Sequence, residues 1–214
     1  MEKDYFEEEF CRNFTEGNCG AIRALFDEAY VIRNEIYDRE PWMKIGPIAS
    51  HDLKAHLLRA AIEKTAYLFC NTGRLPFKVE TLPTIGNHGN HLELTTLTGA
   101  KLFIARIQQA SEKPRNVQYR PNVEPDLFID FQNDYTLRKD FFKDPIDVFL
   151  ATYGDKGMDE FIFGNIGIPG EKSWLFKKDL DKKVNLVLTK PEREEILVEL
   201  ISKEAGGTDA ANSK

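Results

Sequence analysis

The spacing of hydrophobic residues changes once along the chain, near residue 75, and this change limits the fold more than any other feature. Before it, apolar side chains recur every three or four residues, which is the period of an amphipathic helix. After it, short apolar stretches alternate with turn residues, which is typical of strands joined by hairpins. Because the helices are segregated from the strands, we expect an α+β fold rather than a doubly wound sheet.

Three helices are expected in the first 72 residues. Gly17 and Gly20 interrupt the pattern between the first and the second. The second ends before Pro41, because the residue that precedes a proline disfavours the α region. The third is expected at Ser50–Thr72, with its first residue as the N-cap and Gly73 as the left-handed residue that ends it.

Eight short segments that are rich in apolar residues and bounded by turn residues are expected to be strands of a mainly antiparallel sheet. Two hairpin turns are expected, at Thr98-Gly99 and at Gly154–Gly157. The strand at residues 101–108 is apolar on both faces, so we place it at the centre of the sheet. The eight segments are Phe77–Glu80, His91–Thr96, Lys101–Gln108, Asp126–Phe131, Val148–Tyr153, Glu160–Ile168, Trp174–Phe176 and Val184–Leu188.

A C-terminal helix is expected at Glu192–Lys203, because Pro191 suits the first turn of a helix. Small and polar residues follow, which predicts a disordered tail. We therefore divide the chain into an acidic helical arm at residues 1–40, an α+β domain at 41–205 and a tail at 206–214.

Charge is distributed unevenly along the chain. Residues 1–40 contain five Lys/Arg and eleven Asp/Glu, a net charge of −6, whereas residues 41–143 contain fourteen and ten, a net of +4. The overall charge of −6 excludes a generally basic nucleic-acid binder, although the middle of the chain can form a local basic face. The alternative is a mixed, solvated surface.

The N-terminal residues lack the basic and apolar regions of a signal peptide, and no apolar run approaches the roughly 18 residues of a membrane helix. The three cysteines form no CxxC pair and are odd in number, which indicates reduced thiols. We therefore expect a cytoplasmic protein that does not bind a membrane.

Residues that can bind a metal are densest at Gly86–Glu93. His88 and His91 are three residues apart, and Glu93 points to the same side of a strand as His91. Glu93 and Asp130 also offer the carboxylates with which a metal-dependent nuclease holds Mg²⁺ and positions water. No HExxH motif is present and the spacing names no further ligand, so the alternative is a loop with exposed histidines.

A basic set begins at the end of the central strand and continues into the next loop. Arginine beside an aromatic residue suits phosphate contact and base stacking, and it suits the acidic patch of a protein equally well. A solvated loop is the alternative. The candidate binding residues are Arg106, Arg115, Tyr119 and Arg120.

The first helix carries Phe6, Phe10 and Phe14 on one face. A helix of about a dozen residues is marginal in water, so it must dock on something. It docks either on its own domain, as part of the core, or on a second copy or a basic partner. The sequence leaves both alternatives open.

No strong catalytic spacing is present, so we favour a cytoplasmic protein-interaction or regulatory module. A bacterial or phage antitoxin and a defence-system component are examples. Its partner is a protein or a second copy, with nucleic acid as a further option for the basic segment, and no cofactor is expected. The alternative is a metal-dependent hydrolase or nuclease acting on nucleic acid. It uses a divalent metal at His88 and His91, with Glu93 and Asp130 as catalytic residues.

Overall fold

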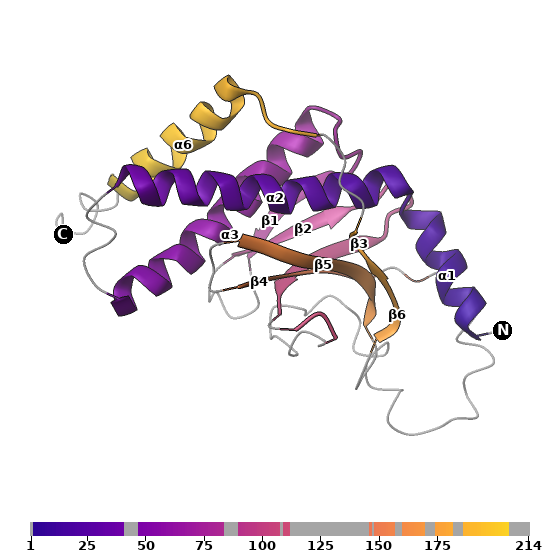
Figure 1. Ribbon diagram of the computed structural model, residues 1–214. Helices are drawn as coiled ribbons and strands as arrows, with labels where there is room; N and C mark the ends of the chain where they lie inside the picture. The colour runs from indigo at the N-terminus through magenta and orange to yellow at the C-terminus, as the bar shows by residue number, and fades with distance from the viewer. Residues whose placement is uncertain are drawn as a thin grey trace, which may run out of the picture.

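The computed structural model describes residues 2–40, 47–83, 90–107, 109–111, 146, 148–156, 160–169, 174–181 and 186–205. In these ranges the chain forms four helices and one six-stranded sheet, an α+β fold as the sequence predicts (Figure 1). The helices are α1 (Glu2–Asn13), α2 (Glu16–Arg39), α3 (Pro47–Asn71) and α6 (Lys190–Ala205). The strands are β1 (Lys78–Pro83), β2 (Asn90–Thr95), β3 (Lys101–Arg106), β4 (Val148–Lys156), β5 (Glu160–Pro169) and β6 (Trp174–Asp179).

The six strands lie in chain order across the sheet, and the sheet is mainly antiparallel as predicted. The exception is the central pair, where β3 runs parallel to β4 and Arg106 lies opposite Tyr153. A parallel pair needs a crossover of a dozen or more residues, and the chain between β3 and β4 is longer than that. The central place predicted for residues 101–108 is confirmed for β3.

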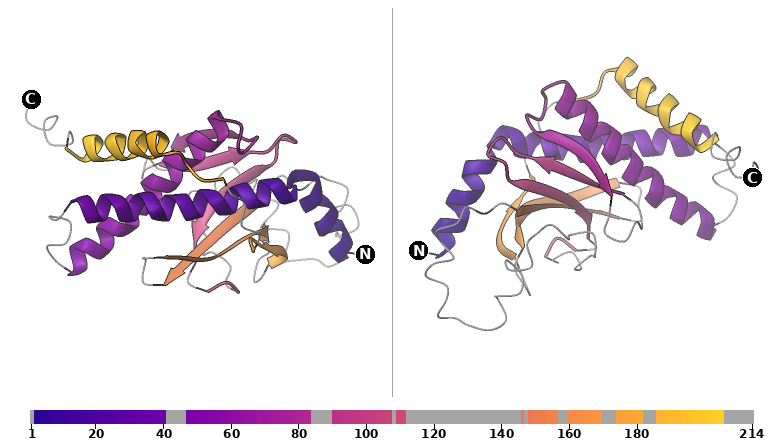
Figure 2. Two further views of the ribbon diagram at one scale, coloured as in Figure 1. Left: turned by 45° about the horizontal axis from the view of Figure 1, so that its top comes forward. Right: turned by 180° about the vertical axis from the view of Figure 1, so that it is seen from behind.

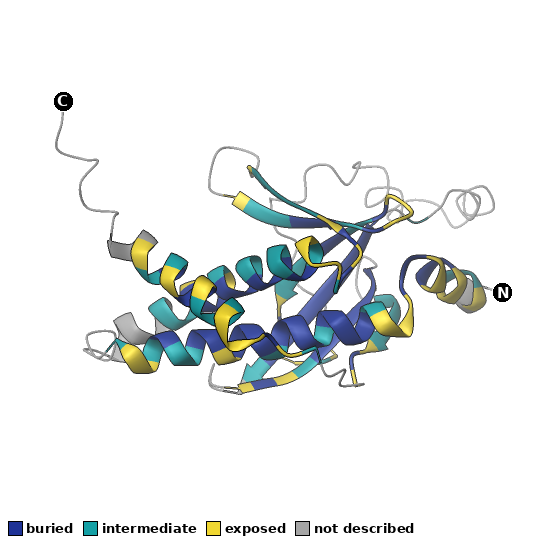
Figure 3. Ribbon diagram, turned by 90° about the horizontal axis from the view of Figure 1, so that it is seen from above, coloured by how far each residue is buried: buried dark blue, intermediate teal, exposed yellow. Residues whose placement is uncertain are grey.

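The helices form two layers on one face of the sheet. α1 packs on β5 and β6, α2 on β5, and α3 on β1, while α6 lies outside them across α2 and α3 (Figures 1 and 2). α2 is buried along most of its length, and one hydrophobic core joins residues from α1 to α6 (Figure 3). The core therefore continues across residue 40, and the division of the chain into an arm at residues 1–40 and a domain at 41–205 stays a prediction. None of the described helices is long and apolar enough to span a bilayer.

The break between the first two helices lies earlier than the sequence suggests. Thr15 caps α2, and its hydroxyl accepts a hydrogen bond from the Asn18 amide at 3.1 Å. Gly17 and Gly20 consequently lie inside α2 instead of separating it from α1. The cap decides the boundary because it satisfies an amide that would otherwise be unpaired at the helix start.

The third helix begins at Pro47, so the prediction of Ser50 as its N-cap is wrong. Proline suits the first turn, since its missing amide hydrogen would have no partner there. The other end of the helix is as predicted. Gly73 has φ +73°, a left-handed conformation that glycine adopts without strain.

The hairpin turn predicted at Thr98-Gly99 is confirmed, since β2 and β3 pair antiparallel on either side of Gly99, whose φ is +94°. The turn predicted at Gly154–Gly157 begins too early, because Gly154 lies within β4 and pairs with Phe163. The strand predicted at Val184–Leu188 is wrong over residues 186–188, which are not in a strand. The strand predicted at Asp126–Phe131 lies outside the described residues.

Candidate functional site

The best-defined polar cluster near the sheet brings together Arg106, Asp155 and Tyr30. Arg106 ends β3, and Asp155 lies near the end of the neighbouring parallel strand β4. The Arg106 Nε and Nη2 atoms donate to the two carboxylate oxygens of Asp155 at 3.0 and 2.6 Å. Tyr30 on α2 donates its hydroxyl to the same carboxylate at 2.5 Å. Asp155 therefore fixes the orientation of Arg106 with respect to the helical layer.

The protonation states of this cluster follow from its burial and its contacts. Burial raises the pKa of Tyr30, and the hydrogen bond to Asp155 raises it further, so the phenol stays protonated and acts as a donor. Burial alone would lower the pKa of Arg106, but the hydrogen bonds to Asp155 and the attraction of its negative charge together outweigh burial and raise that pKa. The guanidinium is therefore charged throughout the physiological range.

The exposure of the cluster determines what it can bind. The Asp155 side chain is 1% exposed, whereas that of Arg106 is 40% exposed. The bidentate contact uses Nε and Nη2, so the end of the guanidinium formed by Nη1 and Nη2 can still donate to another group. A planar guanidinium pairs well with a carboxylate or a phosphate. The arrangement can therefore hold one further anionic group.

The two described residues of the predicted metal site, His91 and Glu93, lie on one face of β2. Glu93 is 5% exposed, its carboxylate lies 3.4 Å from the Lys101 amine, and Glu80 on β1 is its partner across the strand pair. Burial lowers the pKa of His91 even though Glu93 opposes the shift, so the imidazole is neutral at pH 7. Within the described residues, no three His, Cys, Asp or Glu side chains lie close enough together to hold a metal ion.

The remaining predicted residues of both polar sites lie outside the described part of the chain. His88 of the predicted metal site and Asp130 of the predicted catalytic pair are not among the described residues. The basic set is described only at Arg106. Arg115, Tyr119 and Arg120 are not described, so their roles stay predictions.

The three phenylalanines of α1 face the protein's own core. Phe10 and Phe14 are 1% and 3% exposed, and Phe6 is half-buried against the same cluster. The Phe14 ring lies 4.9 Å from that of Phe149 on β4 and 5.9 Å from that of Phe77. Helix α1 therefore docks on its own domain as part of the core, which is the first of the two alternatives that the sequence leaves open.

Sequence reasoning did not identify Tyr30 or Asp155 as partners of Arg106. Tyr30 fits the apolar pattern of α2, and Asp155 falls in a segment that resembles a turn. Arg106 and Asp155 meet because β3 pairs in parallel with β4, and no spacing in the sequence predicts that pairing. No protein-family model matches the chain, and neither the curated proteins nor the solved structures yield a match.

Proposed function

We propose that the protein is an interaction module that binds an acidic segment of a partner protein at Arg106. The observation that carries this proposal is the exposed guanidinium held in place by buried Asp155 and Tyr30. A side chain that is already ordered loses little conformational entropy when it binds. Arginine is also among the residue types enriched at the energetic hot spots of protein interfaces.

A protein partner is favoured over nucleic acid by the charges around the site. Asp155 compensates part of the charge of Arg106, so the described site offers one oriented guanidinium and not a cluster of cations. Binding to a phosphate backbone depends on many uncompensated positive charges acting together. A single oriented guanidinium is better suited to one carboxylate.

The proposal is tested by titrating the full chain with a short glutamate-rich peptide. Arg106→Lys keeps the charge but lacks the planar fork, so we expect the Kd to rise about tenfold or more. Lys78→Met is the matched control, because Lys78 is an exposed cation on β1 that pairs with Glu80. Equal losses in the two variants, or no loss in either, would overturn the proposal. Tighter, Arg106-dependent binding of a single-stranded oligonucleotide would point to nucleic acid instead.

A second candidate function, metal-dependent hydrolysis of nucleic acid, is favoured by one observation. Glu80 and Glu93 lie opposite each other on β1 and β2, which supplies carboxylates on neighbouring strands. Under this function, His91→Ala and Asp130→Ala abolish cleavage in the presence of Mg²⁺, Mn²⁺ or Zn²⁺. The melting temperature of the metal-free protein changes little. No cleavage with any of the three metals would rule this function out.

A further inference from the structure

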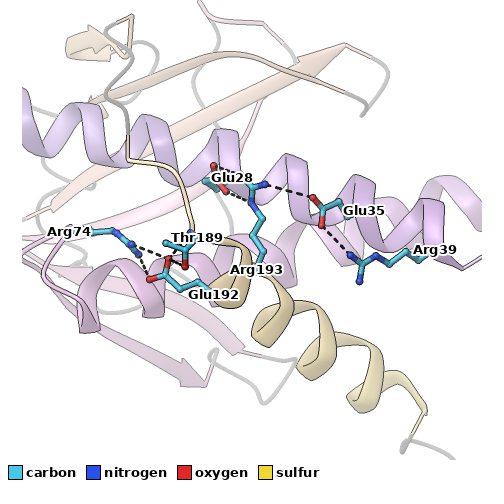
Figure 4. A network of polar contacts seen from close by, with 7 residues as sticks. All are labelled: Glu28, Glu35, Arg39, Arg74, Thr189, Glu192 and Arg193. Carbon is cyan, nitrogen blue, oxygen red and sulfur yellow. Dashed lines mark hydrogen bonds and ion pairs between the residues drawn. The ribbon is translucent and has the colours of Figure 1, made fainter.

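Ion pairs join α6 to α2, to α3 and to the segment after α3, and those of Glu192 and Arg193 are drawn in Figure 4. Arg193 makes a bidentate contact with Glu28 of α2 at 2.9 and 3.0 Å, and it also lies 3.9 Å from Glu35. Glu192 and Glu194 each lie 2.9 Å from an arginine. The three further pairs are Glu192 with Arg74, Glu194 with Arg39, and Glu199 with Lys64.

The apolar part of this interface lies on one side of α6 and belongs to the main hydrophobic core. Ile196, Leu197 and Leu200 are buried, while Val198 on the outer side is exposed. The conformational entropy lost when a helix of this length becomes ordered opposes the free energy gained by burying its apolar side chains. The docking of α6 therefore combines this apolar side with its charged contacts.

The central ion pair makes release of the helix easier than its geometry suggests. Glu28 is only 5% exposed, so its carboxylate loses hydration when Arg193 docks against it. Both charges regain that hydration when α6 leaves, which offsets much of the lost attraction. The pairs of Arg39 with Glu194 and of Lys64 with Glu199 are more exposed and weaken as salt increases.

We propose that α6 is a strap that leaves α2 and α3 as a unit when ionic strength rises, while the rest of the fold stays intact. The contacts of α2 with β5 and of α3 with β1 do not involve α6. The first turn of α6 is also held by hydrogen bonds to Thr189, the residue that precedes the helix. The Thr189 amide and hydroxyl donate to the Glu192 carboxylate at 2.7 and 2.8 Å, and these two contacts involve neither α2 nor α3. Release exposes the face of α2 around Glu28.

Hydrogen exchange of the full chain, measured by mass spectrometry, tests the strap directly. NaCl is raised from about 0.01 M to about 1 M, which shortens the Debye length from ~30 Å to ~3 Å. We expect amide exchange in α6 to accelerate about tenfold or more, with α2 and α3 unchanged. No acceleration in α6, or an equal acceleration in all three helices, would overturn the proposal.

Two variants separate the ion pair from general destabilisation. Arg193→Met leaves Glu28 buried without its partner, so exchange in α6 should accelerate about tenfold or more even at low salt. The double variant Glu28→Met with Arg193→Met replaces the pair with apolar contacts, so α6 should stay docked at low salt. Its salt response should persist, because the exposed pairs of Arg39 with Glu194 and of Lys64 with Glu199 remain. Lys78→Met, which removes an ion pair on β1, should keep the full response. A double variant whose α6 exchanges at low salt as fast as that of Arg193→Met alone would refute the role of this pair.

Discussion

Two threonines, Thr65 of α3 and Thr152 of β4, are fully buried, and in the described part of the chain neither hydroxyl has a hydrogen-bond partner. An unpaired buried hydroxyl costs about 1–3 kcal/mol. Valine has nearly the same shape, so Thr65→Val and Thr152→Val should each raise the free energy of unfolding by about 1 kcal/mol in urea titrations. Thr96→Val is the control and should lower it, because the Thr96 hydroxyl donates to Asn13 and accepts from the Ala100 amide. A loss of stability in Thr152→Val would mean that its hydroxyl is paired.

Glu192 makes the stability of the protein depend on pH in the acid range. The hydrogen bond from Arg74, then that from the Thr189 amide, lowers the Glu192 pKa from 4.5 to about 2. A carboxyl group with a lowered folded-state pKa stabilises the fold above its unfolded pKa and loses this effect as pH falls through the folded one. Glu192→Gln should therefore be less stable than the native chain at pH 7, and the difference should vanish between pH about 4.5 and about 2. Chemical unfolding of both proteins across this pH range measures the difference between their free energies of unfolding. A difference that does not change with pH would contradict the prediction.

At the scale of the elements, the sequence predicts what depends on neighbours in the chain. The helix at Ser50–Thr72 and the turn at Gly99 follow from apolar period and glycine chemistry, and both are present. What it cannot predict depends on distant pairing. The parallel register of β3 with β4 joins strands more than 40 residues apart, and it creates the contact of Arg106 with Asp155. The pair of Arg193 with Glu28, 165 residues apart, likewise has no local signal.

Helix α3 is an element whose apolar stripe faces the core. Leu58 is 2% exposed and belongs to the main hydrophobic cluster. Leu58→Ala should lower the free energy of unfolding by about 2–5 kcal/mol, through lost burial and the cavity that remains. His56→Ala changes an exposed residue of the same helix and should stay within about 0.5 kcal/mol. Denaturant titration of the three proteins decides it, and a loss of less than about half a kcal/mol in Leu58→Ala would mean that α3 does not face a core.

At the scale of the whole molecule, α1 closes the end of the core next to β6 (Figure 1). The Phe10 ring lies 5.1 Å from that of Phe176 on β6 and 6.3 Å from that of Phe149 on β4. Deleting residues 1–14 would expose the rings of Phe149, Phe176 and Phe77, which Phe10 and Phe14 now cover. We therefore expect the truncated chain to aggregate or to lose its cooperative thermal transition, as judged by size-exclusion chromatography and calorimetry.

Point variants of α1 distinguish a core helix from an interaction arm without removing the helix. Phe10→Ala and Phe14→Ala should each lower the free energy of unfolding by about 3–5 kcal/mol, because both rings are fully buried. Glu7→Ala and Glu8→Ala change exposed residues of the same helix and should have little effect on stability. A truncated chain that stays folded and monodisperse but loses a partner or a dimer would instead favour the arm. A truncated chain that keeps both its fold and every association would contradict both alternatives, since three phenylalanines on one face would then contribute neither to the core nor to binding.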